Sequence, residues 1–274
     1  MNTALQKLRD ANKNYRFICV GLDTDIEKIP SSLKSSPDPI LEFNKRIIDA
    51  TKDLAAAYKF NLAFYERNGA KGLNTLFQSI KLIPSDILII GDGKRGDIGN
   101  TSKKYAEMLY NEFNFDSVTL NPLMGRDSLE PFLAYDDKLN FILALTSNPS
   151  AQDFEKLKLE DNSFLYQEII KKVKLWNTNN NCGFVFGATN RHELESEINS
   201  FDNLPVLLPG IGAQGGSLEE VVKIFKLNNH ENYLINLSRA LIYKSNGDKF
   251  DLMAREELIG INRKICGIYH ICPK

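Results

Sequence analysis

The sequence predicts an α/β fold, a single (β/α)8 barrel of the TIM type whose functional site lies at the C-terminal ends of the strands. The length of 274 residues suits one such barrel, because these domains commonly occupy about 250 residues. Eight short apolar segments alternate with segments of helical periodicity. Polar side chains collect where the apolar segments end. No linker or shift in composition divides the chain, so we expect one domain over residues 1–274.

The expected strands are short apolar runs that end at turn signals. They are 17–23, 55–61, 87–90, 117–121, 141–147, 182–189, 205–216 (a strand opening into a glycine-rich loop) and 233–239. Helices are expected where apolar residues recur every three to four positions. They are 4–14, 37–53, about 69–82, 102–111, about 128–135, about 163–177, one beginning near 191, and 218–225. Residues 152–163 and 246–274 match no motif, and the sequence assigns them no role.

Composition argues against nucleic-acid and membrane partners and indicates the cellular compartment. The formal charge is −1, from 34 basic and 35 acidic residues, which leaves no electrostatic footprint for nucleic acid or an anionic membrane. No run of about 18 apolar residues occurs, and the N-terminal stretch lacks the apolar core of a signal peptide. Cys19, Cys182, Cys266 and Cys272 show no metal-binding spacing. We therefore expect a cytoplasmic protein with reduced thiols.

Charged residues follow directly at the C-terminal end of the third predicted strand. Four apolar residues at 87–90 run directly into Asp92, Lys94 and Asp97, which are spaced by small residues. Asp92 and Lys94 are two apart and share one face of a strand, and the glycines are expected to turn the chain and bring Asp97 back towards them. The alternative is a solvated turn. The direct start from a buried strand and the alternating signs favour a functional site.

Two further strands end in charged residues, Asp23 and Lys59. With Asp92, Lys94 and Asp97 they would form an alternating array of acids and bases around the barrel mouth. Carboxylates keep a neighbouring lysine protonated, so it is better suited to donate a proton than to form a Schiff base. A fixed carboxylate would also repel an anionic substrate, and loss of CO₂ relieves that repulsion. For Lys59 alone, the alternative is an aliphatic stem packed on the core with its ammonium in solvent.

A phosphate site is predicted after the seventh and eighth strands. The glycine-rich loop 210–216 offers backbone N–H groups, and Arg239 arrives from the adjacent strand end with a bidentate guanidinium. Barrels often bind phosphate at this place. The alternative is that the glycines only permit a tight turn.

With these residues in place, the sequence resembles the orotidine 5′-phosphate decarboxylase family, which makes UMP from OMP. The run from Asp92 to Thr101 matches the family signature D-x-K-R-G-D-I-G-x-T, in the version typical of its second bacterial subgroup. Other barrel-end motifs match in order from about residue 17 to 245, at positions 21–23, 59–61, 146–149, 209–216 and 238–239.

The resemblance implies catalytic roles. Asp92 would lie near the orotate carboxylate, Lys94 would deliver the proton to C6, and Lys59 would hold the array and contact the ribose. Asp97 and Thr101 would act on the partner's active site in a homodimer.

The resemblance also implies substrate contacts. Asp23 would bind the ribose 3′-hydroxyl and Ser147 the pyrimidine. Gln214, Gly215 and Arg239 would hold the phosphate. The family uses no metal and no organic cofactor. The segments 209–218 and 148–162 are expected to close over the bound nucleotide.

Two other functions share parts of this pattern. Sugar-phosphate decarboxylases and aldol-type synthases of the wider superfamily use the same Asp-x-Lys-x-x-Asp array with Mg²⁺, but lack the K-R-G-D-I-G form. A non-catalytic nucleotide-binding module would keep the phosphate site alone. The array argues against such a module, because binding an anion does not require two acids beside it.

Overall fold

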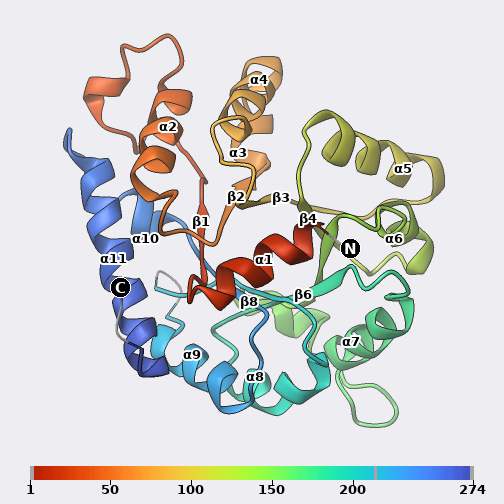
Figure 1. The fold of residues 1–274 in the computed structure, drawn as a ribbon. Coiled ribbons are helices and arrows are strands. Elements are labelled where there is room, and N and C mark those ends of the chain that lie inside the picture. Colours follow the sequence, from red (N-terminus) through yellow and green to blue (C-terminus); the bar gives the residue numbers. More distant parts are fainter. Residues whose placement is uncertain (1–2, 213–214, 272–274) are drawn as a thin grey trace.

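The computed structural model describes residues 3–212 and 215–271, and its centre is a closed barrel of eight parallel strands in sequence order (Figure 1). The strands are β1 (Ile18–Gly21), β2 (Ala57–Asn61), β3 (Leu88–Arg95), β4 (Ser117–Leu120), β5 (Leu139–Leu145), β6 (Cys182–Phe186), β7 (Val206–Leu208) and β8 (Tyr233–Leu237). The predicted barrel is confirmed. Every predicted strand is present, with bounds that differ by a few residues.

Helices surround the barrel. They are α1 (Thr3–Lys13), α2 (Pro39–Thr51), α3 (Ala63–Glu66), α4 (Gly69–Ile80), α5 (Gly99–Glu107), α6 (Arg126–Leu133), α7 (Leu165–Trp176), α8 (Arg191–Glu197), α9 (Leu218–Leu227), α10 (Arg239–Ile242) and α11 (Phe250–Tyr269). The helices are amphipathic, as α2 illustrates. Its N-terminus is capped by Asp38, which accepts from the Leu41 N–H, and it buries Phe43, Ile47 and Ile48.

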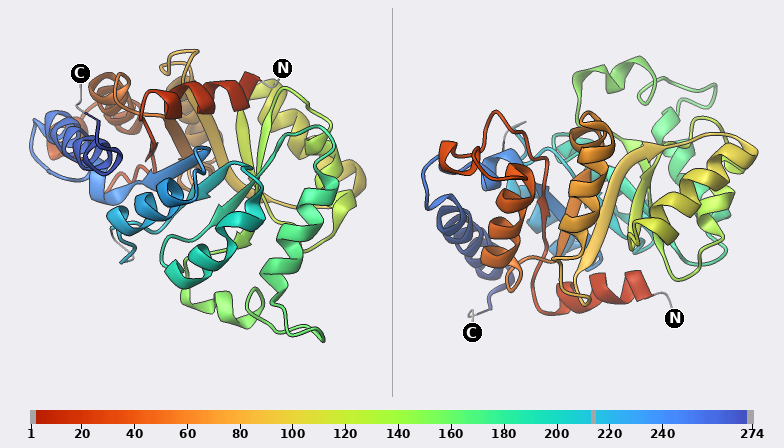
Figure 2. Two further views of the ribbon diagram at one scale, coloured as in Figure 1. Left: turned by 60° about the horizontal axis from the view of Figure 1, so that its bottom comes forward. Right: turned by 90° about the horizontal axis from the view of Figure 1, so that it is seen from above.

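Apolar side chains pack in two layers. A large cluster fills the space between the strands and the outer helices. A smaller one fills the barrel interior, where Leu88, Ile90 and Phe141 meet Leu8 of α1. Helix α1 lies across one end of the barrel, and the segment around residue 150 lies at the opposite end (Figure 2). The interior is therefore closed at the α1 end, and a site has room only at the other.

The register of the strands decides which charged residues meet. Lys59 pairs with Gly21 of β1 on one side and with Ile90 of β3 on the other, and Asn61 pairs with Asp92. Lys59, Asn61 and Asp92 lie towards the C-terminal ends of their strands, so their side chains converge on one mouth of the barrel.

Several elements differ from the predictions. The short helices α3 and α10 were not predicted, and two longer elements also differ. Strand β3 continues through the charged run to Arg95, so the expected turn comes later, at Gly96–Ile98. The 20-residue helix α11 was not predicted. It packs against α2 and α9, where Arg255 pairs with Asp53 and Arg46 pairs with Asp251.

Candidate active site

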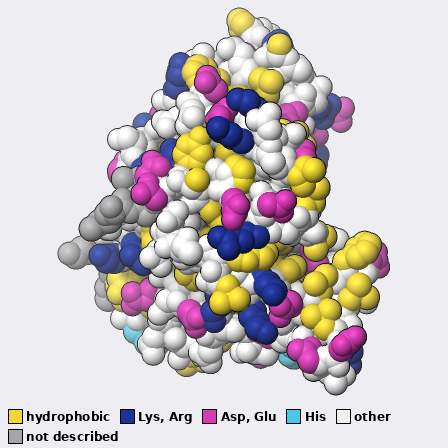
Figure 3. Space-filling model, turned by 90° about the vertical axis from the view of Figure 1, so that its right-hand side faces the viewer, with side chains coloured by type: hydrophobic (Ala, Val, Ile, Leu, Met, Phe, Trp, Pro, Cys, Tyr) yellow, Lys and Arg dark blue, Asp and Glu magenta, His cyan; other side chains and the backbone are white. Residues whose placement is uncertain are grey.

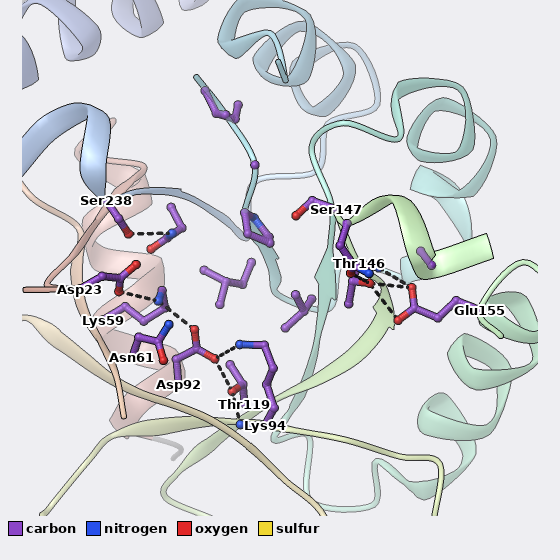
Figure 4. Close-up of a pocket in the computed structure, with 18 of the residues that line it drawn as sticks. Asp23, Lys59, Asn61, Asp92, Lys94, Thr119, Thr146, Ser147, Glu155 and Ser238 are labelled. Carbon is purple, nitrogen blue, oxygen red and sulfur yellow. Dashed lines mark hydrogen bonds and ion pairs between the residues drawn. The ribbon is translucent and has the colours of Figure 1, made fainter. Parts of the chain in front are cut away.

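A cavity of about 510 Å³ opens at the C-terminal ends of the strands. Six residues predicted from the sequence line it: Asp23, Lys59, Asp92, Lys94, Ser147 and Arg239. Most of these are drawn in Figure 4, which shows the acids and lysines on one side and Ser147 on the other. The structure thus brings together side chains from β1, β2, β3, β5 and β8 that are far apart in sequence.

Lys59 and Asp92 form a buried ion pair at the floor of this cavity. Lys59 Nζ lies 2.8 Å from Asp92 Oδ2, and Lys59 is only 4% exposed. Burial alone would lower the pKa of Lys59, but the Asp92 and Asp23 carboxylates outweigh it and raise that pKa. The alternative in which the Lys59 ammonium lies in solvent is therefore wrong.

Asp92 sits between two lysines. Its second oxygen, Oδ1, lies 2.6 Å from Lys94 Nζ and accepts from the Thr119 hydroxyl at 2.8 Å. Burial would raise the pKa of Asp92, but the Lys59 and Lys94 ammonium groups hold it well below its usual range. Asp92 is therefore an ionised carboxylate whose oxygens are all engaged with donors.

Lys94 has an unusual backbone. Its φ is +47°, in the left-handed region that non-glycine residues seldom adopt, and its N–H donates to Thr119 Oγ1 at 2.9 Å. Strained residues of this kind cluster at functional sites. Thr119 was not predicted as a site residue; its place near the end of the fourth strand was the only signal that pointed to it.

Asp23 completes the array. Its Oδ1 lies 3.5 Å from Lys59 Nζ. Two tyrosines hold the backbone around it: Tyr65 donates to the Leu22 carbonyl at 2.8 Å, and the Tyr243 hydroxyl donates to the Asp23 carbonyl at 3.1 Å. The same Tyr243 oxygen accepts from the Asp25 N–H at 2.7 Å. Sequence reasoning did not identify either tyrosine.

The glycine-rich loop has the conformation that glycine permits. Gly210, Gly212 and Gly215 all have positive φ, and the loop closes through the Gly216 N–H on the Gly210 carbonyl at 3.1 Å. Gly210 lines the cavity, whereas Gly215 is not among its lining residues. Gln214, predicted to bind phosphate, lies outside the described residues. Arg239 is exposed at the start of α10 and lines the same cavity.

Asp97 and Thr101 do not line the cavity. Asp97 Oδ1 accepts from the following N–H, that of Ile98, at 2.8 Å, and Thr101 is exposed in the first turn of α5. In a single chain the expected return of Asp97 towards Asp92 and Lys94 is therefore not seen.

This cavity can be compared with those of known proteins. The profile of the orotidine 5′-phosphate decarboxylase / HUMPS family matches residues 16–249. The chain belongs to this family. The orotidine 5′-phosphate decarboxylase of Flavobacterium johnsoniae is 46% identical over 255 residues, which cover 92% of this chain and 93% of that protein. The decarboxylase of Dehalococcoides mccartyi is 44% identical over 256 residues, 92% of this chain and 93% of that protein.

Solved structures of this family share the fold. The Leishmania donovani OMP decarboxylase superposes with a TM-score of 0.80 at 32% identity, over 95% of this chain and 98% of that one. The UMP synthase of the same organism superposes with a TM-score of 0.79 at 34% identity, over 94% of this chain and 56% of that one. The predicted family and activity, a decarboxylase of pyrimidine nucleotide synthesis, are confirmed.

The described residues offer neither a membrane span nor a cluster of metal ligands. No helix within 3–212 or 215–271 is long and apolar enough to span a membrane. In the same ranges no three His, Cys, Asp or Glu side chains gather in a way that could hold a metal ion.

Proposed function

We propose that the Lys59–Asp92–Lys94 array carries out the decarboxylation of OMP, with Lys94 as the proton donor. The C6–carboxylate bond breaks, its electron pair stays on C6, CO₂ leaves, and a proton from the Lys94 ammonium bonds to C6. The observation that carries this proposal is the position of Asp92, an ionised carboxylate in the cavity with Lys94 Nζ 2.6 Å away.

Asp92 has two tasks in this scheme. It holds the Lys94 ammonium beside the cavity, and its charge repels the substrate carboxylate before reaction. That repulsion disappears as CO₂ departs. It therefore raises the free energy of the ground state more than that of the transition state. Lys59 neutralises the other oxygen of Asp92 and keeps the cluster ionised despite its burial.

The substrate contacts follow the strand ends. We assign the ribose 3′-hydroxyl to Asp23, the pyrimidine to Ser147, and the phosphate to Arg239 with Gln214 and Gly215. In this assignment the phosphate binds at one end of the cavity and the reacting carbon lies at the other. Phosphate binding energy then speeds the reaction only through the part that is expressed in the transition state.

We further propose a homodimer in which Asp97 and Thr101 enter the partner's active site. Neither residue lines the cavity of its own chain. Ile98, next to Asp97, is 56% exposed, and Leu123 and Met124 in the loop after β4 are 57% and 51% exposed. Figure 3 views the side of the molecule that carries α5 and α6, where hydrophobic side chains lie open among charged ones. A second copy of the chain would cover them.

The remaining assignments are a single decarboxylase domain over residues 1–274, no metal or organic cofactor, and a cytoplasmic location. The described thiols of Cys19 and Cys182 are buried and unpaired, which suits a reducing compartment. Pairing of Cys266 with Cys272 involves a residue outside the described ranges.

The test is the loss of OMP absorbance on mixing with the purified protein, with and without EDTA. Equal rates in both samples are expected. A rate that collapses in EDTA would instead favour the Mg²⁺-dependent chemistry of the wider superfamily, and binding of UMP without any turnover would favour a nucleotide-binding module.

A further inference from the structure

Glu155 lines the cavity but belongs neither to the Lys59–Asp92–Lys94 array nor to the proposed phosphate site. It belongs to the segment 148–157, which follows β5, contains a 3₁₀ helix (Pro149–Asp153) and lies over the cavity. In Figure 4 its carboxylate points at Thr146, the first residue after β5, on the side of the cavity opposite the lysines. Thr146 is followed directly by Ser147.

Glu155 makes short hydrogen bonds with two groups of Thr146, the backbone N–H and the hydroxyl. Glu155 Oε2 accepts from the Thr146 backbone N–H at 2.6 Å, and the Thr146 hydroxyl lies 2.9 and 3.0 Å from the two carboxylate oxygens. The hydroxyl also lies 2.7 Å from Asn148 Oδ1, so Glu155 shares it with Asn148. Among the described residues, the Thr146 backbone N–H donates to Glu155 without such a competitor. Charge-assisted bonds of this kind are among the stronger hydrogen bonds in proteins.

Glu155 makes these bonds without an ion pair. In the part of the chain that the structure describes, no ammonium or guanidinium is paired with it, and the adjacent Lys156 pairs with Glu193 of α8 instead. Burial raises the pKa of Glu155, and the Thr146 hydrogen bonds oppose that rise. Across residues 3–212 and 215–271, the hydrogen bonds that this half-buried carboxylate accepts all come from Thr146, so Thr146 offsets the cost of burying it.

The neighbours of Ser147 are fixed from the other side as well. The Thr146 carbonyl accepts from Asn190 Nδ2 at 2.9 Å. Gly187 lies so close that a Cβ there would stand 2.8 Å from Ser147 N and Cα. Thr146 and Ser147 are therefore contacted by Glu155 from the segment after β5 and by Gly187 and Asn190 from the loop after β6.

We propose that Glu155 is a positioning residue for the substrate's base: it holds Thr146 so that the hydroxyl of the adjacent Ser147 faces the pyrimidine. This inference rests on the role of Ser147 in the proposed function. It predicts a selective defect, in which recognition of the base is weakened while recognition of the ribose phosphate is untouched.

The test compares two inhibitors of OMP decarboxylation, UMP and ribose 5-phosphate, which differ by the base. In Glu155→Ala we expect the inhibition constant of UMP to rise about tenfold and that of ribose 5-phosphate to stay unchanged. Glu155→Gln should lose less, since its amide oxygen still accepts from the Thr146 N–H. Glu160→Ala removes an exposed carboxylate of the same stretch and should match the wild type with both inhibitors.

Two results would overturn the proposal. One is an unchanged UMP constant in Glu155→Ala; the other is an equal loss for both inhibitors, which indicates general damage to the site. If Glu155→Ala does not fold, Glu155→Gln decides, and it must show the base-selective loss.

Ser147→Ala separates this inference from the proposed function. If Ser147→Ala binds both inhibitors like the wild type, the assignment of Ser147 to the pyrimidine fails. If Ser147→Ala shows the base-selective loss and Glu155→Ala does not, the role of Glu155 alone fails. With both roles correct, the double variant binds UMP no more weakly than Ser147→Ala, because Glu155 acts through Ser147.

Discussion

At the scale of single residues, the proposed chemistry depends on a carboxylate that stays charged although it is buried. Asp92 does so because two ammonium groups and the Thr119 hydroxyl surround it. The charged residues themselves were predictable, since each follows an apolar strand. Thr119 and Glu155 were not, because their roles depend on contacts between strand ends that only the register and the loop path establish.

The first prediction concerns Lys94. In Lys94→Ala we expect kcat to fall by about 10²–10⁴-fold, the usual contribution of a positioned proton donor, while UMP binds nearly as well as before. Steady-state kinetics and UMP titration measure the two quantities. Lys45→Ala, an exposed lysine on α2, is the control. Full activity in Lys94→Ala would refute the assigned proton donor.

The second prediction concerns the ionisation of Asp92. Its pKa is lower in the folded than in the unfolded state, so its contribution to the free energy of unfolding is present above about pH 4 and is lost as the pH falls towards the folded value. Urea unfolding of the wild type and of Asp92→Asn measures this. The difference between them should be constant between about pH 7 and pH 5 and change only below about pH 4. A change centred near neutral pH would show that Asp92 is not held ionised.

At the scale of elements, some site residues lie at strand ends and others in the loops that follow the strands. The strands were predictable because apolar runs stop at polar residues. The third strand extends further than expected, since its charged residues still pair with β2 and β4. The buried positions of α11, at 250, 254, 258 and 265, do lie at helical spacing. The sequence did not indicate the surface on α2 and α9 against which that face packs.

The third prediction concerns the loop and helix after β8. In Arg239→Ala we expect the KM for OMP to rise about ten- to hundredfold with a smaller effect on kcat, because a charged bidentate contact to the phosphate is lost. Orotidine, which lacks the phosphate, serves as the control substrate, and its kcat/KM should be the same in both proteins. An unchanged KM for OMP would contradict the phosphate assignment.

At the scale of the whole molecule, the proposed dimer divides the charged run after residue 90 between two active sites. Asp92 and Lys94 line the cavity of their own chain, and Asp97 and Thr101 do not. The sequence could predict this division only through family resemblance, because nothing in one chain's pattern of residues specifies a partner. The exposed apolar residues Ile98, Leu123 and Met124 are what a second copy would cover.

The central claim, a site shared by two chains, is tested by mixing two inactive variants, Lys94→Ala and Asp97→Ala. Subunits exchanged in equal amounts give hybrid dimers in half of the population. If Asp97 serves the partner's site, each hybrid contains one site with both defects and one intact site, so the mixture should recover about a quarter of the wild-type activity. If Asp97 serves its own chain, every site stays defective, and a mixture as inactive as the two variants alone would contradict the account.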